Sequence, residues 1–142
     1  MGAVKSILAL AVITASFFAG IFFTKVTECG ANCGKELETV SAQEFFKHLS
    51  DGNIEVIDVR TPEEYSDGHI KDSVNADIKN TDQFTKFLAT LDKKKTYLVY
   101  CRSGVRAGEA MKLMTEKGFT RITNLSGGVL SWQAADYPLT SE

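Results

Sequence analysis

From Thr39 onward, the chain alternates short runs of β-forming residues with segments in which apolar residues recur at helical spacing. The β-forming runs predict strands over 54–59, 74–76, 96–100 and 122–125. The periodic segments predict helices that begin near residues 41, 61, 81, 105 and 128. Short strands separated by helices are typical of an α/β fold, in which a largely parallel central sheet is flanked by helices.

Helix start signals support three of these boundaries. Ser41 with Glu44, and Thr61 with Glu64, have the spacing of a capping box, in which each side chain satisfies a backbone N–H group of the other residue. Thr81 is predicted to cap the next helix. The run 96–100 is nearly all apolar, as expected of a central parallel strand that is buried on both faces.

Residues 1–26 follow a different pattern, because no charge interrupts the apolar run 7–23. A run of this length at the start of a chain predicts either a secretory signal peptide or an N-terminal membrane anchor, with 7–23 as the candidate membrane attachment. Both interpretations predict a location in the cell envelope, periplasmic or extracytoplasmic. The polar residues 27–38 are predicted as a linker, and residues 39–142 as the folded domain.

The chain has three cysteines, and two of them lie in this predicted linker. Cys29 and Cys33 could pair in an oxidising compartment, which would leave Cys101 as the free thiol. A single Cys-x-x-x-Cys with no second pair is weak support for zinc. Either a local disulfide or two unpaired thiols without a function fits the spacing better than a metal site, so no metal is predicted.

Length and charge limit the class of protein. The 142 residues suffice for one domain and an extension, with 44% hydrophobic and 24% charged residues. A formal net charge of -2, with scattered basic residues, gives no electrostatic basis for a nucleic-acid partner. The sequence has no glycine-rich nucleotide loop and no convergent carboxylate cluster, so no cofactor is predicted.

The candidate chemistry lies where the strand 96–100 stops at Cys101. A strand that leads through a short loop to a helix presents several backbone N–H groups to one point, where they favour an anion. This context predicts a nucleophilic thiolate in an anion cradle; the alternative is a buried free cysteine that ends a core strand. Gly104 lets the loop turn, Ser103 is either a hydrogen-bond donor or a helix cap, and Arg102 either meets an anionic substrate or is solvated. Arg106 either binds the anion or pairs with a carboxylate beneath the loop.

Three polar side chains outside this loop are also candidates. Asp58 and Arg60 end the strand 54–59; a structural ion pair or a hydrogen bond to the loop is favoured over a general base, because a thiolate with a lowered pKa needs no base. His69 could form a Cys–His dyad, but in a Gly-His-Ile turn it is expected to satisfy backbone groups. His48 is expected to be solvated.

Three motifs in order resemble the single-domain rhodaneses over about residues 39–138. They are Ile57-Asp58-Val59-Arg60 with Glu64-Tyr65 and Gly68-His69-Ile70, then Cys101-Arg102-Ser103-Gly104-Val105-Arg106, then Ser126-Gly127-Gly128 with Trp132. The resemblance implies a rhodanese-like three-layer sandwich. It also implies a sulfurtransferase that carries sulfane sulfur on Cys101 from thiosulfate, polysulfide or a persulfide to cyanide or a thiol. Substrate contacts are implied for residues 102–106.

Two alternatives belong to other functional classes. Cysteine-based phosphatases and arsenate reductases also place a cysteine and an arginine around an anion, but their spacing resembles Cys-x5-Arg. Here the spacing is Cys-x4-Arg, which makes a smaller ring suited to a single sulfur atom. The other alternative is a non-catalytic sulfur carrier or a partner-binding module.

Overall fold

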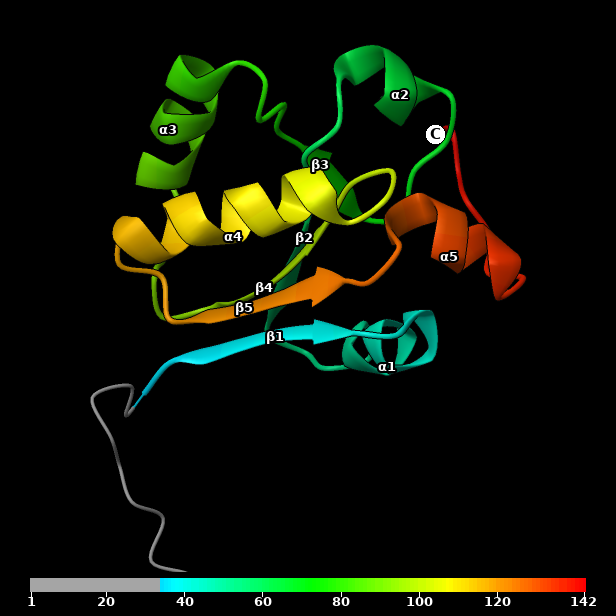
Figure 1. The fold of residues 1–142 in the computed structure, drawn as a ribbon, viewed down its shortest axis with the longest axis horizontal. Helices are drawn as coiled ribbons and strands as arrows, with labels where there is room; N and C mark the ends of the chain where they lie inside the picture. The colour runs from blue at the N-terminus through cyan, green and yellow to red at the C-terminus, as the bar shows by residue number, and fades with distance from the viewer. Residues whose placement is uncertain (1–33) are drawn as a thin grey trace, which may run out of the picture. The chain divides into compact units, whose positions relative to one another are not determined.

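A computed structural model describes residues 34–142. Within that range the strands form one five-stranded, all-parallel sheet in the order β1-β5-β4-β2-β3 (Figure 1). The elements in chain order are β1 (Glu36–Val40), α1 (Ala42–His48), β2 (Ile54–Asp58), α2 (Pro62–Ser66), β3 (Ser73–Asn75), α3 (Thr81–Ala89), β4 (Thr96–Tyr100), α4 (Val105–Glu116), β5 (Arg121–Leu125) and α5 (Gly128–Ala134).

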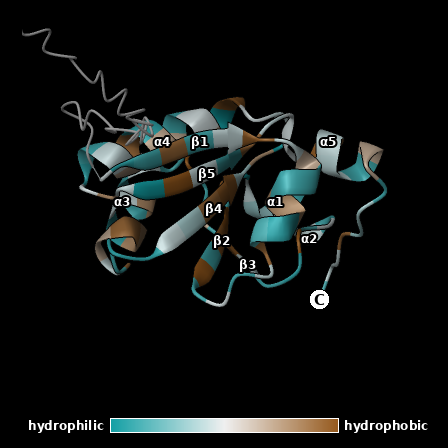
Figure 2. Ribbon diagram, turned by 90° about the horizontal axis from the view of Figure 1, so that it is seen from below, coloured by the Kyte–Doolittle hydropathy of each residue, from teal (hydrophilic) through white to brown (hydrophobic). Residues whose placement is uncertain are grey.

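The sheet separates two apolar clusters, so the domain has three layers. On one face, side chains of β2, β4 and β5 pack against α3 and α4, around Phe84, Leu88 and Met114. On the other face, α1 and α5 supply Phe45 and Trp132 to the second cluster. In Figure 2 the ribbon of α1 is largely hydrophilic, whereas β4 and β2 carry hydrophobic segments. The predicted α/β sandwich with a parallel sheet is confirmed.

The central strand β4 shows how one sequence supplies both clusters. Tyr97 and Val99 belong to the cluster beneath α3 and α4, and Leu98 and Tyr100 to the one beneath α1 and α5. All four residues are fully buried. Successive side chains of a strand point to opposite faces, so a strand covered on both sides is apolar throughout.

The strand β1 was not expected from the sequence. It pairs with β5 in parallel, with Glu36 opposite Arg121 and Val40 opposite Leu125. Residues 36–38 therefore belong to the sheet and not to the predicted linker 27–38, and the domain starts before residue 39. The reason is that β1 lies at the sheet edge with only Val40 buried, so its sequence lacks the apolar pattern of a strand.

The predicted segment 1–26, its apolar run 7–23, and the pair Cys29 and Cys33 lie outside the described residues. Across residues 34–142, none of the helices has the length and hydrophobicity needed to cross a bilayer.

Both capping boxes are confirmed. The hydroxyls of Ser41 and Thr61 each accept a hydrogen bond from the backbone N–H three residues later, at 3.3 Å in both cases. The cap of α3 differs from the prediction: the Asn80 side chain accepts from the Gln83 N–H at 3.2 Å, and Thr81 is the first helical residue. Asparagine is at least as good an N-cap as threonine, so the boundary moves by one residue.

Candidate active site

The Cys101 loop, residues 101–104, joins β4 to α4 at the carboxyl edge of the sheet. The thiol of Cys101 is fully buried and accepts a hydrogen bond from the Gly104 N–H, with 3.0 Å between nitrogen and sulfur. Gly104 is the N-cap of α4 and has a φ of 94°, a conformation that residues with a Cβ rarely adopt. A side chain there would also lie 3.3 Å from the Leu125 oxygen. The sequence therefore needs glycine to bring an N–H group onto the sulfur.

The start of α5 fixes the loop from the other side. The N–H groups of Val129 and Leu130 donate to the carbonyl oxygens of Cys101 and Arg102, at 2.9 and 3.2 Å. Gly128 makes this approach possible: a Cβ on it would lie 2.3 Å from the Cys101 oxygen. In the sequence, the only signal for this role of Gly128 is its place in the third motif. The close approach places the third motif in direct contact with the Cys101 loop.

Arg106, in the first turn of α4, forms an ion pair with Glu64 of α2. Its two terminal nitrogens donate to the two carboxylate oxygens at 2.7 and 2.8 Å. The hydrogen bond from Arg106 lowers the pKa of Glu64 to about 2, and the same bond raises the pKa of Arg106. Of the two roles considered for Arg106, the geometry shows pairing with a carboxylate, which comes from α2.

Sequence reasoning missed Glu64 as a site residue. The sequence places Glu64 in a capping box and in the first motif, and neither assigns it a contact with the Cys101 loop or α4. In the structure its Oε2 atom caps α2, accepting from the Thr61 N–H at 3.2 Å, and also accepts from Arg106. The signal available in the sequence was its place in the first motif. Nothing in the local pattern shows that an arginine 42 residues later folds onto the same carboxylate.

The remaining loop side chains face outward. Arg102 and Ser103 are exposed, and Val105 is 68% exposed. Gly104, not Ser103, is the N-cap of α4, so Ser103 has no capping role. Within residues 34–142, Arg102 takes part in none of the ion pairs, whereas the site's other two arginines are both paired.

Asp58 and Arg60 form a buried ion pair at the carboxyl end of β2. The Arg60 guanidinium donates to both Asp58 oxygens, at 3.0 Å from Nε and 2.6 Å from Nη2, and also to the Gly68 oxygen at 2.7 Å. Asp58 is fully buried and Arg60 is 5% exposed, so each charge depends on the other. The guanidinium lies 5.7 Å from the centre of the Tyr100 ring. Burial of the Tyr100 hydroxyl raises its pKa. The pair joins β2 to the turn before β3.

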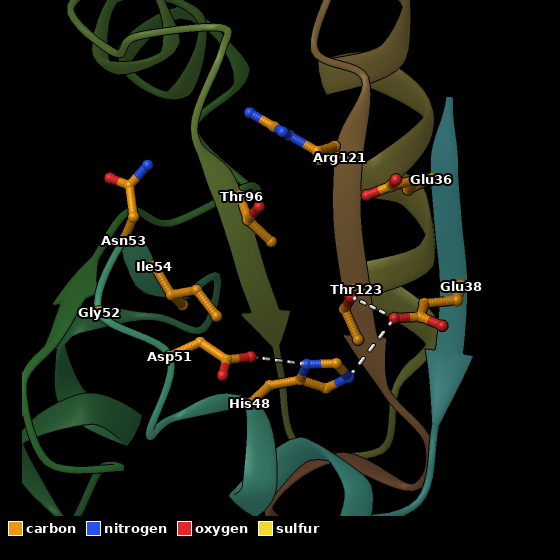
Figure 3. Close-up of a pocket in the computed structure, with 10 residues that line it drawn as sticks. All are labelled: Glu36, Glu38, His48, Asp51, Gly52, Asn53, Ile54, Thr96, Arg121 and Thr123. Carbon is orange, nitrogen blue, oxygen red and sulfur yellow. Dashed lines mark hydrogen bonds and ion pairs between the residues drawn. The ribbon is translucent and has the colours of Figure 1, made fainter. Parts of the chain in front are cut away.

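The two histidines have structural contacts. The Nδ1 atom of His69 lies 3.0 Å from the Tyr65 oxygen, the His69 ring stacks on the Tyr65 ring, and its backbone pairs with Thr140. The side chain of His48 is 35% exposed and also contacts two carboxylates. Its Nε2 atom lies 3.5 Å from a carboxylate oxygen of Glu38, and its Nδ1 atom lies 3.4 Å from one of Asp51, in a cavity of about 380 Å³ (Figure 3). The contact with Glu38 was not expected, because Glu38 belongs to the unexpected strand β1.

The described part of the chain holds no cluster of three or more His, Cys, Asp or Glu side chains that could bind a metal ion. The arrangement suits covalent chemistry at a single thiol. It combines a buried sulfur, an N–H donor aimed at it, a helix N-terminus and a backbone fixed by two glycines.

Together, the parallel sheet and this loop define an α/β protein with a buried cysteine thiol just before the start of a helix. The chain matches the family model described as "Rhodanese-like domain" over residues 41–135. It therefore belongs to the rhodanese-like family.

Known relatives support this assignment. The "Putative sulfurtransferase YtwF" of Bacillus subtilis (strain 168) is 36% identical over 104 residues, which cover 73% of this chain and 95% of the relative. A rhodanese-related protein from Thermoplasma volcanium superposes with a TM-score of 0.64 at 28% identity, covering 74% of this chain and 99% of that structure. Family and relative support sulfur-transfer chemistry in a sulfurtransferase-like enzyme.

A second group of relatives is longer. The tRNA uridine(34) hydroxylase of Pelagibacter ubique (strain HTCC1062) is 34% identical over 98 residues. These residues cover 69% of this chain and 33% of the hydroxylase, so the chain matches only about a third of that relative's length.

Proposed function

We propose that the protein is a sulfurtransferase that moves a sulfane sulfur through a persulfide on Cys101. The observation that carries the proposal is the Gly104 N–H, which donates to the Cys101 sulfur at 3.0 Å from the N-terminus of a helix. A donor in this position stabilises the Cys101 thiolate before sulfur transfer and the Cys101 persulfide after it.

In the first half-reaction, the Cys101 thiolate attacks the outer sulfur of thiosulfate. A bond forms between Sγ and that sulfur while the bond to the sulfonate sulfur breaks, and sulfite leaves with the electron pair. In the second half-reaction, cyanide or a thiolate attacks the outer sulfur of the persulfide. The bond to Sγ breaks, its electron pair returns to Cys101, and thiocyanate or a new persulfide departs. A polysulfide or a persulfide donor would react in the same way.

The state of Arg106 favours this reaction over phosphoryl transfer. A phosphatase needs its loop arginine free to bind the equatorial oxygens of the phosphate, because charge spreads onto them in the transition state. Here both terminal nitrogens of Arg106 are held by Glu64. A single sulfur atom needs no such arginine, because the Gly104 N–H at the N-terminus of α4 already donates to it.

Intact-mass spectrometry tests the proposal. Incubation with thiosulfate should add the mass of one sulfur atom to the protein, and cyanide should remove it and yield thiocyanate. Cys101→Ser should give no adduct. The double variant of Cys29→Ser and Cys33→Ser should react as the wild type does, because those thiols lie outside the loop. An adduct that survives in Cys101→Ser, or cysteine-dependent hydrolysis of an aryl phosphate, would refute the proposal.

We also propose that the apolar run 7–23 directs the protein to the cell envelope, as a signal peptide or as an anchor. Sulfur transfer would then take place outside the cytoplasm. Fractionation of cells that express the full chain should find it in the membrane or periplasmic fraction. Full-length chain in the cytosol would contradict this location.

A further inference from the structure

A cleft of about 360 Å³ lies beside the Cys101 loop and is lined by residues of both α2 and α5. Its lining comes from four parts of the fold: the end of β2, helix α2 and its C-terminal turn, the loop, and α5 with the chain after it. The lining residues are Arg60, Glu64, Asp67, Gly68, Arg102, Val129, Leu130, Gln133 and Leu139. The cleft therefore adjoins the loop through Arg102 and the carboxylate that holds Arg106 through Glu64.

The cleft is much larger than the simplest substrates require. A water molecule occupies about 30 Å³ of the liquid, so the cleft has room for about a dozen. Thiosulfate or cyanide would leave most of this space to water. A volume of about 360 Å³ is within the range of sites that bind small organic molecules, roughly 300–1,000 Å³.

One wall of the cleft is apolar. Val129, Leu130 and Leu139 contribute to it, and Leu130 is 51% exposed, so its side chain is available for contact with a bound molecule. Methylene groups of an organic ligand would remove this surface from water, whereas thiosulfate and cyanide have none.

The charges of the cleft identify the polar part of the ligand. Arg60 is paired with Asp58, and Glu64 is paired with Arg106, so neither is available. Arg102 and Asp67 also line the cleft, are exposed, and have no ion pair among residues 34–142. One cation and one anion thus remain for a ligand that carries both a carboxylate and an ammonium group.

We propose that this cleft is the acceptor site and that it binds an amino-acid or peptide thiol. The acceptor's carboxylate is held by Arg102, its ammonium by Asp67, and its methylene groups lie on Leu130. The proposal rests on the sulfurtransferase function above and adds the class of acceptor. Its thiolate attacks the outer sulfur of the Cys101 persulfide. The Sγ–S bond breaks, Cys101 regains its thiolate, and the sulfur leaves as the acceptor's persulfide.

Single-turnover discharge of the persulfide tests the acceptor site, because the donor then plays no part in the measured step. Protein charged with thiosulfate and freed of excess donor is mixed with each of four thiols. Cysteine has a carboxylate and an ammonium group, mercaptopropionate only the carboxylate, cysteamine only the ammonium, and mercaptoethanol neither. For each thiol the rate of the variant is divided by that of the wild type, so differences in intrinsic thiol reactivity cancel.

Arg102→Gln should slow discharge by cysteine and mercaptopropionate about fivefold, the strength of an exposed charged contact, relative to the other two thiols. Asp67→Asn should likewise slow cysteine and cysteamine relative to the other two. Lys112→Gln, an exposed residue of α4, removes one positive charge outside the cleft and should change no ratio between thiols.

Equal effects of Arg102→Gln on thiols with and without a carboxylate would overturn the proposed acceptor class, as would equal effects of Asp67→Asn on thiols with and without an ammonium group. Failure of the sulfurtransferase function itself looks different. In that case no persulfide forms on Cys101, or cyanide cannot discharge it.

Discussion

The ion pair between Glu64 and Arg106 yields a prediction that separates two roles of one carboxylate. Glu64 accepts from the Thr61 N–H in the cap of α2 and from both terminal nitrogens of Arg106. Glutamine is also accepted at this position of a capping box, so Glu64→Gln keeps the cap and removes the charge. The variant should loosen the connection between α2 and the start of α4, and with it the Cys101 loop.

The pKa of Glu64 sets the size of the effect. The hydrogen bond from Arg106 lowers it from 4.5 to about 2. At about 1.4 kcal/mol per pKa unit, this shift has an upper limit of roughly 3 kcal/mol. The two side chains are 29% and 21% exposed, so solvent screening reduces the expected loss to roughly 1–2 kcal/mol of unfolding free energy near neutral pH. A lowered carboxyl pKa stabilises the fold above the unfolded value of about 4.5, and this stabilisation is lost as the pH falls toward 2.

Urea denaturation over a pH series measures this loss. Glu64→Gln should be less stable than the wild type at neutral pH. The two stability curves should approach each other as the pH falls from about 4.5 toward 2, because Glu64 of the unfolded wild type takes up a proton in this range before Glu64 of the folded protein does. Glu44→Gln is the matched control. Glu44 occupies the same position in the capping box of α1, where it accepts from the Ser41 N–H at 3.1 Å, but it has no arginine partner among the described residues.

The same variants should differ in activity. Glu64→Gln should slow formation of the Cys101 persulfide from thiosulfate, because Arg106 no longer fixes the first turn of α4, whereas Glu44→Gln should not. Equal losses of stability in the two variants at every pH, or a difference between Glu64→Gln and wild type that does not shrink in acid, would refute the role assigned to the ion pair.

Asp58→Asn should cost about 3–5 kcal/mol of unfolding free energy, because it leaves the buried Arg60 guanidinium without its charge partner; a loss below 1 kcal/mol would argue against a buried pair. Gly128→Ala should disrupt the loop and abolish persulfide formation, because the new Cβ would lie 2.3 Å from the Cys101 oxygen. Gly108→Ala in α4 is the control substitution, because a Cβ at this position has no heavy atom within 4 Å. It should raise the melting temperature, with a stabilisation of about 0.5–1 kcal/mol.

Most of the fold could be predicted because its signals are local. The buried strand over 96–100, the two capping boxes and the helix that starts at Val105 depend on neighbouring residues, and the structure has all of them. The edge strand β1 could not be predicted in this way. Its sequence, Glu-Leu-Glu-Thr-Val, has no burial pattern, and its place is fixed only by pairing with β5, about 85 residues later.

The residues of the candidate site also differ in whether a local sequence signal could identify them. Cys101 and Gly104 were identifiable, since a strand that ends in a loop before a helix is a local arrangement. The ion pair of Arg106 with Glu64 joins residues 42 positions apart, and sequence reasoning left its partner open. Two other contacts likewise join distant segments of the chain. Gly128 packs against the Cys101 loop, and His48 lies beside Glu38 of β1.

The parallel sheet also determines how the protein can be attached to a surface or fused to another chain. All five strands run toward the Cys101 loop, so β1 enters the sheet at Glu36 on the edge opposite the loop (Figure 1). The C-terminal residues instead run beside α2, where Thr140 pairs with His69, and Leu139 lines the cleft. A tether joined ahead of β1 would leave the mouth of the site open to a bulky acceptor, whereas one joined after Glu142 would crowd it.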